Sequence, residues 1–463
     1  MELTKYQKSK KSGILFSLVI LFVASTFLLS TGDTLKIVSI NASSIVSMLM
    51  VVVFLLDGSV KGKFALKRHP LQKTLLLLFL WAVISLLIAK IDPSKALPTE
   101  AYSYKWATGL NSPDWRGFSF LFRLFLAIFA IEFIITNVNT REKFFRIVNI
   151  TILFYSIVCF FGLMQIILFG LFNIKIGKII ITPGLENYFR IGGYVGEPQT
   201  FGLILISGYF ILLATIKNQC KEIWFSRQFL KVVFVIATIT LIFTFSVSMI
   251  VAVLSGLAIA SIKYFRKKEI IIGLIICVTL VVSFYEVFNA TIFRKLLHEP
   301  FTINERTITW LIGYKIIKDN PLTGIGIGQA PLVNSVYIPD TVRSGYGHIL
   351  FFDVYRQPPM NTYIEWTAET GLIGGMFLLF LFYKTYKLKA GKQNNFSKFV
   401  KFSYGTTLIA LAIAANSSSG NFYVGLFILT FAMYIRGILF SREEGCGYTV
   451  CTKRHDLLLR DKF

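Results

Sequence analysis

Residues 229–263 read FLKVVFVIATITLIFTFSVSMIVAVLSGLAIASIK. Between its two lysines this run carries only apolar and small polar residues, and it is far longer than the about 20 residues that a helix needs to cross the hydrocarbon core of a bilayer. Tilt absorbs only a few extra residues, so the run predicts two membrane-spanning helices that meet near Ser246 and Ser248. The fold is therefore that of an integral membrane protein.

Comparable apolar runs make up most of the chain. Of its 463 residues, 55% are hydrophobic and only 16% are charged, and the mean hydropathy is +0.66, whereas about a quarter of the residues of a soluble domain are charged. The sequence predicts an all-α polytopic bundle of about 12 transmembrane helices, which forms a single membrane domain over residues 1–463. The predicted spans are 13–30, 36–56, 71–89, 116–135, 146–173, 199–216, 231–247, 249–263, 269–287, 360–384, 402–417 and 420–439.

Basic clusters predict the orientation of these spans. Most of the 48 Lys and Arg residues fall in alternate loops, including 61–68, 263–268 and 384–401, and in the tail 440–463. Because short cytoplasmic loops carry an excess of Lys and Arg, both termini are expected in the cytoplasm of a bacterial cell, with the chain in its inner membrane. The first span follows a lysine-rich start and lacks a small-residue cleavage site, which indicates a retained signal anchor.

The formal charge of +24 does not indicate a nucleic-acid-binding protein. Such proteins present a continuous basic face, whereas these charges lie in short clusters between apolar runs. Three cysteines are expected on the cytoplasmic side and two within spans, so no structural disulfide is expected. Cys446, Cys451 and His455 do not fit a zinc-binding spacing, and the sequence predicts neither a metal site nor a cofactor.

Three longer segments remain outside the cytoplasm, at 90–115, 174–198 and 288–359. The large extracytoplasmic loop 288–359 is expected to carry short amphipathic helices, of which the first is capped by Asn304 and ends before Pro321. Three glycines then follow within residues 324–328 and permit a tight turn and the close approach of a ligand.

Arginines in these outer segments are candidates for binding an anion. Arg306 would lie at the N-terminus of the loop helix, where a guanidinium beside free backbone N–H groups suits a phosphate or diphosphate. Arg190 precedes the sixth span, and Arg123 lies about two turns inside the fourth. The three side chains are candidates for one anionic headgroup, and the open alternative for Arg306 is a snorkelling arginine at the membrane surface.

Four residues are candidates for a general base. Glu365 and Glu369 follow Asn361 at intervals of four residues, so that one face of the tenth span carries all three side chains. Carboxylates inside a membrane are costly unless they serve a function or pair with an arginine to fix the packing of helices, and both interpretations stay open. Glu197, beside the sixth span, and His348, in the large loop, complete the set.

The order of several motifs resembles the O-antigen ligase and polymerase superfamily. The signature region covers Arg-x-x-x-Trp at 306–310, NPLTGIGIG at 320–328, NTY at 361–363 and ETGLIG at 369–374. The resemblance also includes the segment RIGGYVGEP, which begins at Arg190, and the junction near Ser246.

The resemblance implies a twelve-span, GT-C-like membrane glycosyltransferase that takes its glycan from a polyprenyl diphosphate, without a metal or a cofactor. It implies that Arg190 and Arg306 hold the donor diphosphate and that a base near the acceptor hydroxyl completes an inverting displacement. The implied partners are a lipid-linked oligosaccharide, an acceptor glycan or glycolipid, membrane lipid, a flippase and a chain-length regulator.

One departure from the family pattern bears on the type of enzyme. Many relatives, ligases above all, carry His directly before the Asn-x-Tyr segment, whereas this chain carries Met360. The sequence therefore favours a polymerase that joins lipid-linked repeat units of O-antigen, capsule or exopolysaccharide. A ligase that transfers a finished glycan to lipid A core or another acceptor, a lipid-linked glycan flippase and a noncatalytic scaffold remain the alternatives.

Overall fold

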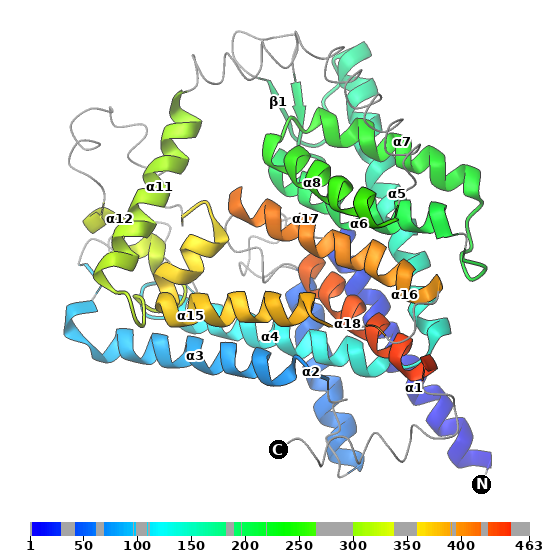
Figure 1. Ribbon diagram of the computed structural model, residues 1–463, viewed down its shortest axis with the longest axis horizontal. Helices are drawn as coiled ribbons and strands as arrows, with labels where there is room; N and C mark the ends of the chain where they lie inside the picture. Colours follow the sequence, from blue (N-terminus) through cyan, green and yellow to red (C-terminus); the bar gives the residue numbers. More distant parts are fainter. Residues whose placement is uncertain are drawn as a thin grey trace.

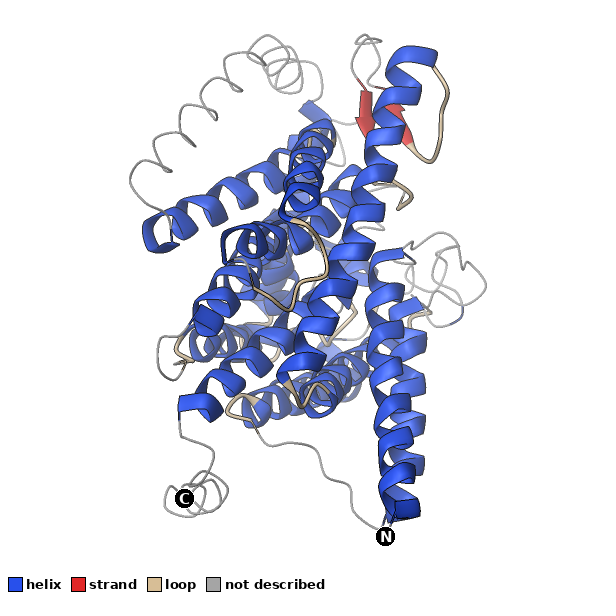
Figure 2. Ribbon diagram, turned by 90° about the vertical axis from the view of Figure 1, so that its right-hand side faces the viewer, coloured by secondary structure: helices blue, strands red, loops and turns tan. Residues whose placement is uncertain are grey.

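The fold is described from a computed structural model of the chain. It describes the following residues: 2–28, 42–61, 69–95, 97–98, 109, 112–181, 189–195, 197–218, 220–264, 300–337, 359–388, 390, 395–417 and 425–445. Within these ranges the chain is almost entirely helical, as the sequence predicts, and the strands form one antiparallel pair, β1(Ile179–Ile181) and β2(Phe189–Ile191). Figure 1 shows the helices packed into one body, and Figure 2 shows the short strands beside the end of a long helix.

Helices in the described part of the chain overlap eleven of the predicted spans. In chain order these helices are α1(Glu2–Leu28), α2(Ala42–Lys61), α3(Gln72–Ile91), α4(Arg116–Asn137), α5(Arg141–Phe172), α6(Pro198–Asn218), α7(Arg227–Phe243), α8(Val247–Tyr264), α15(Thr362–Tyr386), the short α17(Thr406–Ala414) and α18(Gly425–Gly445). Among the described residues, six helices are long and apolar enough to cross a membrane, namely α3, α4, α5, α6, α15 and α18. The chain is thus an all-α membrane protein, while the count of twelve spans stays a prediction and the span at 269–287 lies outside the described residues.

The predicted division of residues 229–263 is confirmed. α7 ends at Phe243 and α8 begins at Val247. Between them Phe245 has a φ of 45°, a left-handed conformation that interrupts the helical path. The hydroxyl of Thr244 donates to the carbonyl of Leu241 at 2.7 Å, which satisfies a backbone acceptor where the helix ends.

Shorter elements complete the described fold. They are the 3-10 turns η1(Pro93–Lys95) and η5(Ala415–Ser417), the helices α11(Pro300–Asp319), α12(Ala330–Tyr337) and α16(Asn395–Val400), and the π-helical turn η4(Lys401–Gly405). The segment from α16 to η5 takes the place of the predicted span 402–417, so this region contains several short helical pieces rather than one regular helix.

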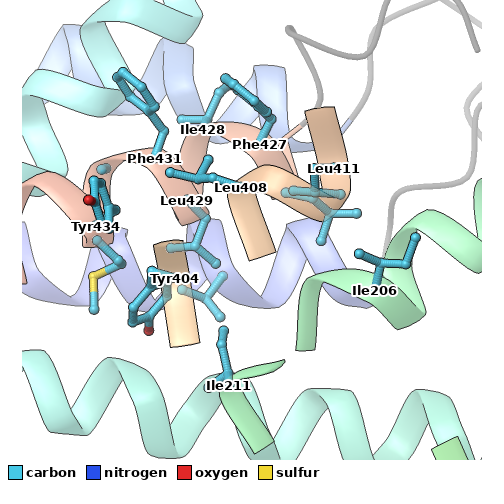
Figure 3. Close-up of a cluster of buried hydrophobic side chains, with 14 of the residues drawn as sticks. Ile206, Ile211, Tyr404, Leu408, Leu411, Phe427, Ile428, Leu429, Phe431 and Tyr434 are labelled. Atoms are coloured by element: carbon cyan, nitrogen blue, oxygen red, sulfur yellow. The ribbon is translucent and has the colours of Figure 1, made fainter. Parts of the chain in front are cut away.

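The core lies where α6, α17 and α18 meet. Side chains from all three helices interdigitate there, and most of them are fully buried (Figure 3). Tyr404 of η4 and Tyr434 of α18 lie among aliphatic side chains such as Ile211 of α6. Most residues of α6 are buried, on all sides of the helix, so α6 holds the central place among its neighbours.

Two groups of helices flank this core. α3, α4 and α15 pack together on one side and carry α11 and α12, whereas α5, α7 and α8 pack with α6 on the other (Figure 1). The β1–β2 hairpin packs against the second group. The rings of Phe169 in α5 and Phe189 in β2 are in edge-to-face contact, with their centroids 4.6 Å apart. Residues from both groups form the candidate site.

The loop helix begins earlier than predicted. α11 starts at Pro300, so Asn304 lies inside the helix and the predicted cap at this residue is wrong. Proline is favoured in the first turn of a helix because its missing N–H would have no partner there. The end before Pro321 is confirmed, and the helix packs its buried Ile308 and Ile312 against the neighbouring α15.

Candidate functional site

The site begins at the seam between α11 and α15. The indole N–H of Trp310 donates to the carbonyl of Met360 at 3.3 Å, and the N–H of Met360 donates to the hydroxyl of Thr309 at 3.4 Å. A Cβ on Gly313 would lie only 2.4 Å from the side chain of Ile364, so the helices approach as closely as a glycine allows. Two motifs that lie about 50 residues apart in the sequence therefore form one structural unit.

The start of α15 carries the predicted polar face. Asn361 caps the helix, because its side-chain oxygen accepts hydrogen bonds from the N–H groups of Tyr363 and Ile364 at 3.0 and 3.2 Å. Glu365 and Glu369, one and two turns further on, are 6% and 2% exposed. The three side chains of this predicted face are thus all buried in the protein.

α15 is broken two residues beyond Glu369. Gly371 has a φ of 71° and a ψ of 179°, which a residue with a side chain rarely adopts. The break turns the N–H of Leu372 toward the carbonyl of Pro321, at 2.7 Å, so that the segment after α11 bonds to the opened helix. The position also has no room for a side chain, since a Cβ on Gly371 would lie 2.1 Å from the carbonyl oxygen of Leu322.

The glycine-rich segment 320–328 docks on this broken helix. The N–H groups of Ile325 and Gly326 donate to the carbonyls of Ala368 and Glu369 at 3.1 and 2.9 Å. A Cβ on Gly324 would lie 2.4 Å from the backbone of Glu369. The sequence suggested that these glycines let a ligand approach, but Gly324 brings the loop against the backbone of α15.

The Glu369 carboxylate fixes the start of α12. Its Oε1 accepts a hydrogen bond from the N–H of Ala330 at 3.2 Å, and the N–H of Gly328 also bonds to this carboxylate. A carboxylate at the N-terminus of a helix is favourable because it satisfies free N–H groups and complements the helix dipole. Glu369 therefore caps α12 in this structure, and its role as a general base stays a prediction.

Arg116 is a site residue that was not predicted from the sequence, where it marks the start of a span. Its Nε donates to the carbonyl of Gly328 at 2.6 Å, and its charge interacts with the carboxylates of Glu369 and Glu365. Only 9% of the residue is exposed. It is the arginine partner that two carboxylates within a membrane require, and its place at the outer end of a span was the available signal.

Arg123 lies seven residues, or about two turns, beyond Arg116 on the same helix, α4. The guanidinium groups of Arg116 and Arg123 lie 5.0 and 5.2 Å from the centroid of the Phe120 ring. Arg123 is half-buried, about 10 Å beyond the start of α4. An aromatic ring beside two cations lowers the cost of placing both in an apolar environment.

Arg306 connects the two groups of helices. Its Nη2 donates to the side-chain oxygen of Gln199 at 3.3 Å, which ties the first part of α11 to the first turn of α6. Glu197 directly precedes α6 and is exposed, and its Oε2 accepts a hydrogen bond from the hydroxyl of Thr200 at 3.0 Å. The helix end that carries Glu197 thus adjoins Arg306.

Arg190 lies at the junction of α7 and α8. It stands opposite Ile180 in the hairpin, and its Nε donates to the carbonyl of Thr244 at 3.2 Å. The hydroxyl groups of Ser246 and Ser248 lie 3.4 Å apart at the same junction. The structure therefore joins the two additional motifs of the family resemblance.

The three candidate arginines contact different partners. Arg123 meets Phe120, Arg190 meets Thr244 and Arg306 meets Gln199. Their convergence on one headgroup stays a prediction, and His348 lies outside the described residues.

Tyr194 lies three residues before Glu197 in the chain. Burial raises the pKa of Tyr194 well above its usual value, so this phenol stays protonated at neutral pH.

A buried polar pair that was not predicted from the sequence lies outside the candidate site. The side chains of His69 and Glu132 form a hydrogen bond of 2.7 Å, far along α4 from Arg116. The described residues contain no group of three or more His, Cys, Asp or Glu that could hold a metal ion, and Cys446, Cys451 and His455 lie outside them.

The fold and the site together define a polytopic membrane protein with arginines and carboxylates in and beside its helical bundle. Residues 232–379 match the O-antigen ligase family, which confirms the resemblance and assigns this part of the chain to the O-antigen ligase and polymerase superfamily. The match covers α7, α8, α11, α12 and most of α15. No curated protein matches the chain. The apolar helices indicate a membrane protein, and the matched family supports a function in polysaccharide biosynthesis of the O-antigen ligase or polymerase type.

Proposed function

We propose that the protein is a polysaccharide polymerase, which joins polyprenyl-diphosphate-linked repeat units at the extracytoplasmic face of a bacterial inner membrane. The contact between Arg306 and Gln199 carries the proposal, because it brings the signature region on α11 next to the segment that contains Arg190 and Glu197. Two half-buried arginines on neighbouring segments suit the two phosphates of a diphosphate.

The proposed reaction is an inverting, metal-independent displacement at a sugar. The hydroxyl oxygen of the acceptor attacks the anomeric carbon of the donor glycan, and the bond from that carbon to the diphosphate oxygen breaks. The bonding electrons leave with the polyprenyl diphosphate, whose growing negative charge Arg190 and Arg306 stabilise. The hydroxyl proton passes to a carboxylate of the protein, which returns it to solvent.

Glu197 is the preferred base for this proton. It is exposed, whereas Glu365 and Glu369 are buried and interact with the charge of Arg116. It also lies two residues from Gln199, the partner of Arg306, so that a base and a diphosphate-binding cation adjoin at one helix end. A base must reach the hydroxyl that attacks, and an exposed carboxylate meets this requirement.

A ligase is the second candidate, because the matched family is described as O-antigen ligase. Met360 is the observation against it, since this position uses only its backbone groups, which bond to Trp310 and Thr309. A thioether cannot exchange the proton that a histidine would exchange. Donor, acceptor glycan, flippase and chain-length regulator are the partners that the polymerase proposal requires.

The test uses the purified protein in liposomes with a lipid-linked repeat unit. The wild type should form a ladder of products on a gel, and Arg306→Gln and Arg190→Gln should each abolish it. The matched control is Lys315→Gln, which removes an exposed charge from the same helix α11 and should leave the ladder intact. A single band with a foreign acceptor would indicate a ligase, and an unchanged ladder in both arginine variants would refute the diphosphate assignment.

A further inference from the structure

A groove of about 260 Å³ lies between α2 and α4. Met48 of α2 and Trp115, Phe118 and Phe122 of α4 form its apolar walls. Among the described residues that line it, Arg123 is the one that carries a charge. An apolar groove with a cation at one end is suited to a lipid that carries a phosphate.

The groove faces the surface that the protein presents to lipid. Trp115, Phe118 and Phe122 are 61%, 47% and 47% exposed, and exposed side chains of a membrane helix contact acyl chains or headgroups. Trp115 directly precedes α4, where the interfacial preference of an indole places it near the headgroups. A lipid can thus enter the groove sideways from the bilayer.

The charged end of the groove leads to the signature region. Arg123 and Arg116 both contact the ring of Phe120, at 5.2 and 5.0 Å. Arg116 in turn bonds to the carbonyl of Gly328, in the glycine-rich segment. A phosphate bound to Arg123 would therefore lie close to Arg116, which contacts the same Phe120 ring and bonds to the glycine-rich segment.

We propose that this groove holds the first isoprene units of the acceptor, the second lipid-linked substrate, with its diphosphate at Arg123. The inference rests on the proposed function, because a polymerase binds two polyprenyl-diphosphate-linked molecules at once, whereas a ligase binds one. The diphosphates of the two substrates need different numbers of cations. The donor diphosphate becomes a leaving group and is assigned two arginines, but the acceptor diphosphate does not react and needs only an anchor.

The first test measures binding. A photoactivatable polyprenyl phosphate is added to liposomes that contain the protein, and the labelled peptides are identified by mass spectrometry. Label is expected on the groove segments 44–48 and 115–126, and Met48→Trp, which fills the groove, should reduce it at least tenfold. Leu49→Trp is the matched control, because Leu49 is the next residue of α2, is 44% exposed and does not line the groove.

Competition decides which lipid occupies the groove. Unlabelled polyprenyl diphosphate should displace the label, and an equal amount of phosphatidylglycerol should not. Equal displacement by both would identify an ordinary anionic phospholipid site and overturn the proposal. Label that appears only on other helices, or that Met48→Trp leaves unchanged, would also overturn it.

The second test measures transfer, with two acceptors that bear the same glycan and differ only in the polyprenyl diphosphate. The wild type should use the lipid-linked acceptor at a KM at least tenfold lower than that of the soluble one. Arg123→Gln and Met48→Trp should remove this preference, and Met48→Trp, which changes only the apolar wall of the groove, should leave the use of the soluble acceptor unchanged. Equal preference in these variants and in the wild type would overturn the groove assignment. Label in the groove without transfer by the wild type would instead refute the polymerase and leave the lipid site in place.

Discussion

Replacement of Gly371 by alanine tests the structural unit on which the site depends. At its φ of 71° a residue with a Cβ is strained by about 1 to 3 kcal/mol. The new methyl group would also lie 2.1 Å from the carbonyl oxygen of Leu322, which is backbone and has to retreat. That retreat would weaken the hydrogen bond from Leu372 to Pro321 and its neighbours, each worth about 1 kcal/mol. We expect a total loss of roughly 3 to 6 kcal/mol.

Thermal unfolding of the purified protein in detergent measures this loss. The Tm of Gly371→Ala should fall by on the order of 5 to 10 °C, and glycan transfer should fall with it, because the glycine-rich loop loses its support. The control is Gly13→Ala in α1, where a Cβ would meet no atom within 4 Å and alanine is the better helix former. A Gly371→Ala variant as stable as the wild type would show that α15 is not broken at this residue.

Three further predictions concern single contacts. Glu369→Leu should lower the stability by about 3 to 5 kcal/mol, because it leaves Arg116 and two N–H groups without the carboxylate. Glu369→Gln should lower the stability less, because the amide oxygen remains as an acceptor. Thermal unfolding compares the two variants. Trp81→Phe removes the indole N–H that donates to the carbonyl of Thr370 at 2.8 Å, so the same measurement should record a loss of about 1 kcal/mol. Burial, together with the Glu222 carboxylate, raises the pKa of the Cys220 thiol to about 11. Since the thiolate is the reactive form, maleimide labelling in a variant without the other cysteines should rise about tenfold per pH unit from pH 7 to 10 and be faster in Glu222→Gln. A rate that levels off near pH 8 would contradict this environment.

Much of the fold followed from patterns that are local in the sequence. The run 229–263 exceeds the thickness of a bilayer, and its division between Phe243 and Val247 is where the small polar residues allowed the helix to end. The start of α11 was predicted wrongly, because Asn304 is a good cap only if the helix has not already begun at Pro300. A capping residue indicates a position where a helix can start, and tertiary packing determines at which of these positions the helix does start.

The candidate site divides in the same way. The common face of Glu365 and Glu369 followed from helical spacing, and the need for an arginine partner followed from the cost of carboxylates in a membrane. The identity of that partner did not follow, because Arg116 lies about 250 residues away in the chain and meets the carboxylates only through the packing of α4 against the glycine-rich loop. The candidates Arg123, Arg190 and Arg306 were recognised as cations, but their contacts depend on Phe120, Thr244 and Gln199.

The sequence by itself determined that this is a helical membrane protein and that it resembles the O-antigen ligase and polymerase superfamily, because hydrophobic length, charge bias and short motifs are properties of contiguous residues. Only the tertiary structure decided what the motifs do. The glycines of residues 324–328 could have surrounded a ligand, and the position of Gly371, which breaks α15, decides that they dock on a helix. Glu369 was predicted as a candidate base, and only the tertiary structure shows that the N–H groups of Gly328 and Ala330 bond to its carboxylate at the start of α12. Backbone groups are the same in every residue, so the sequence does not record which of them a side chain will meet.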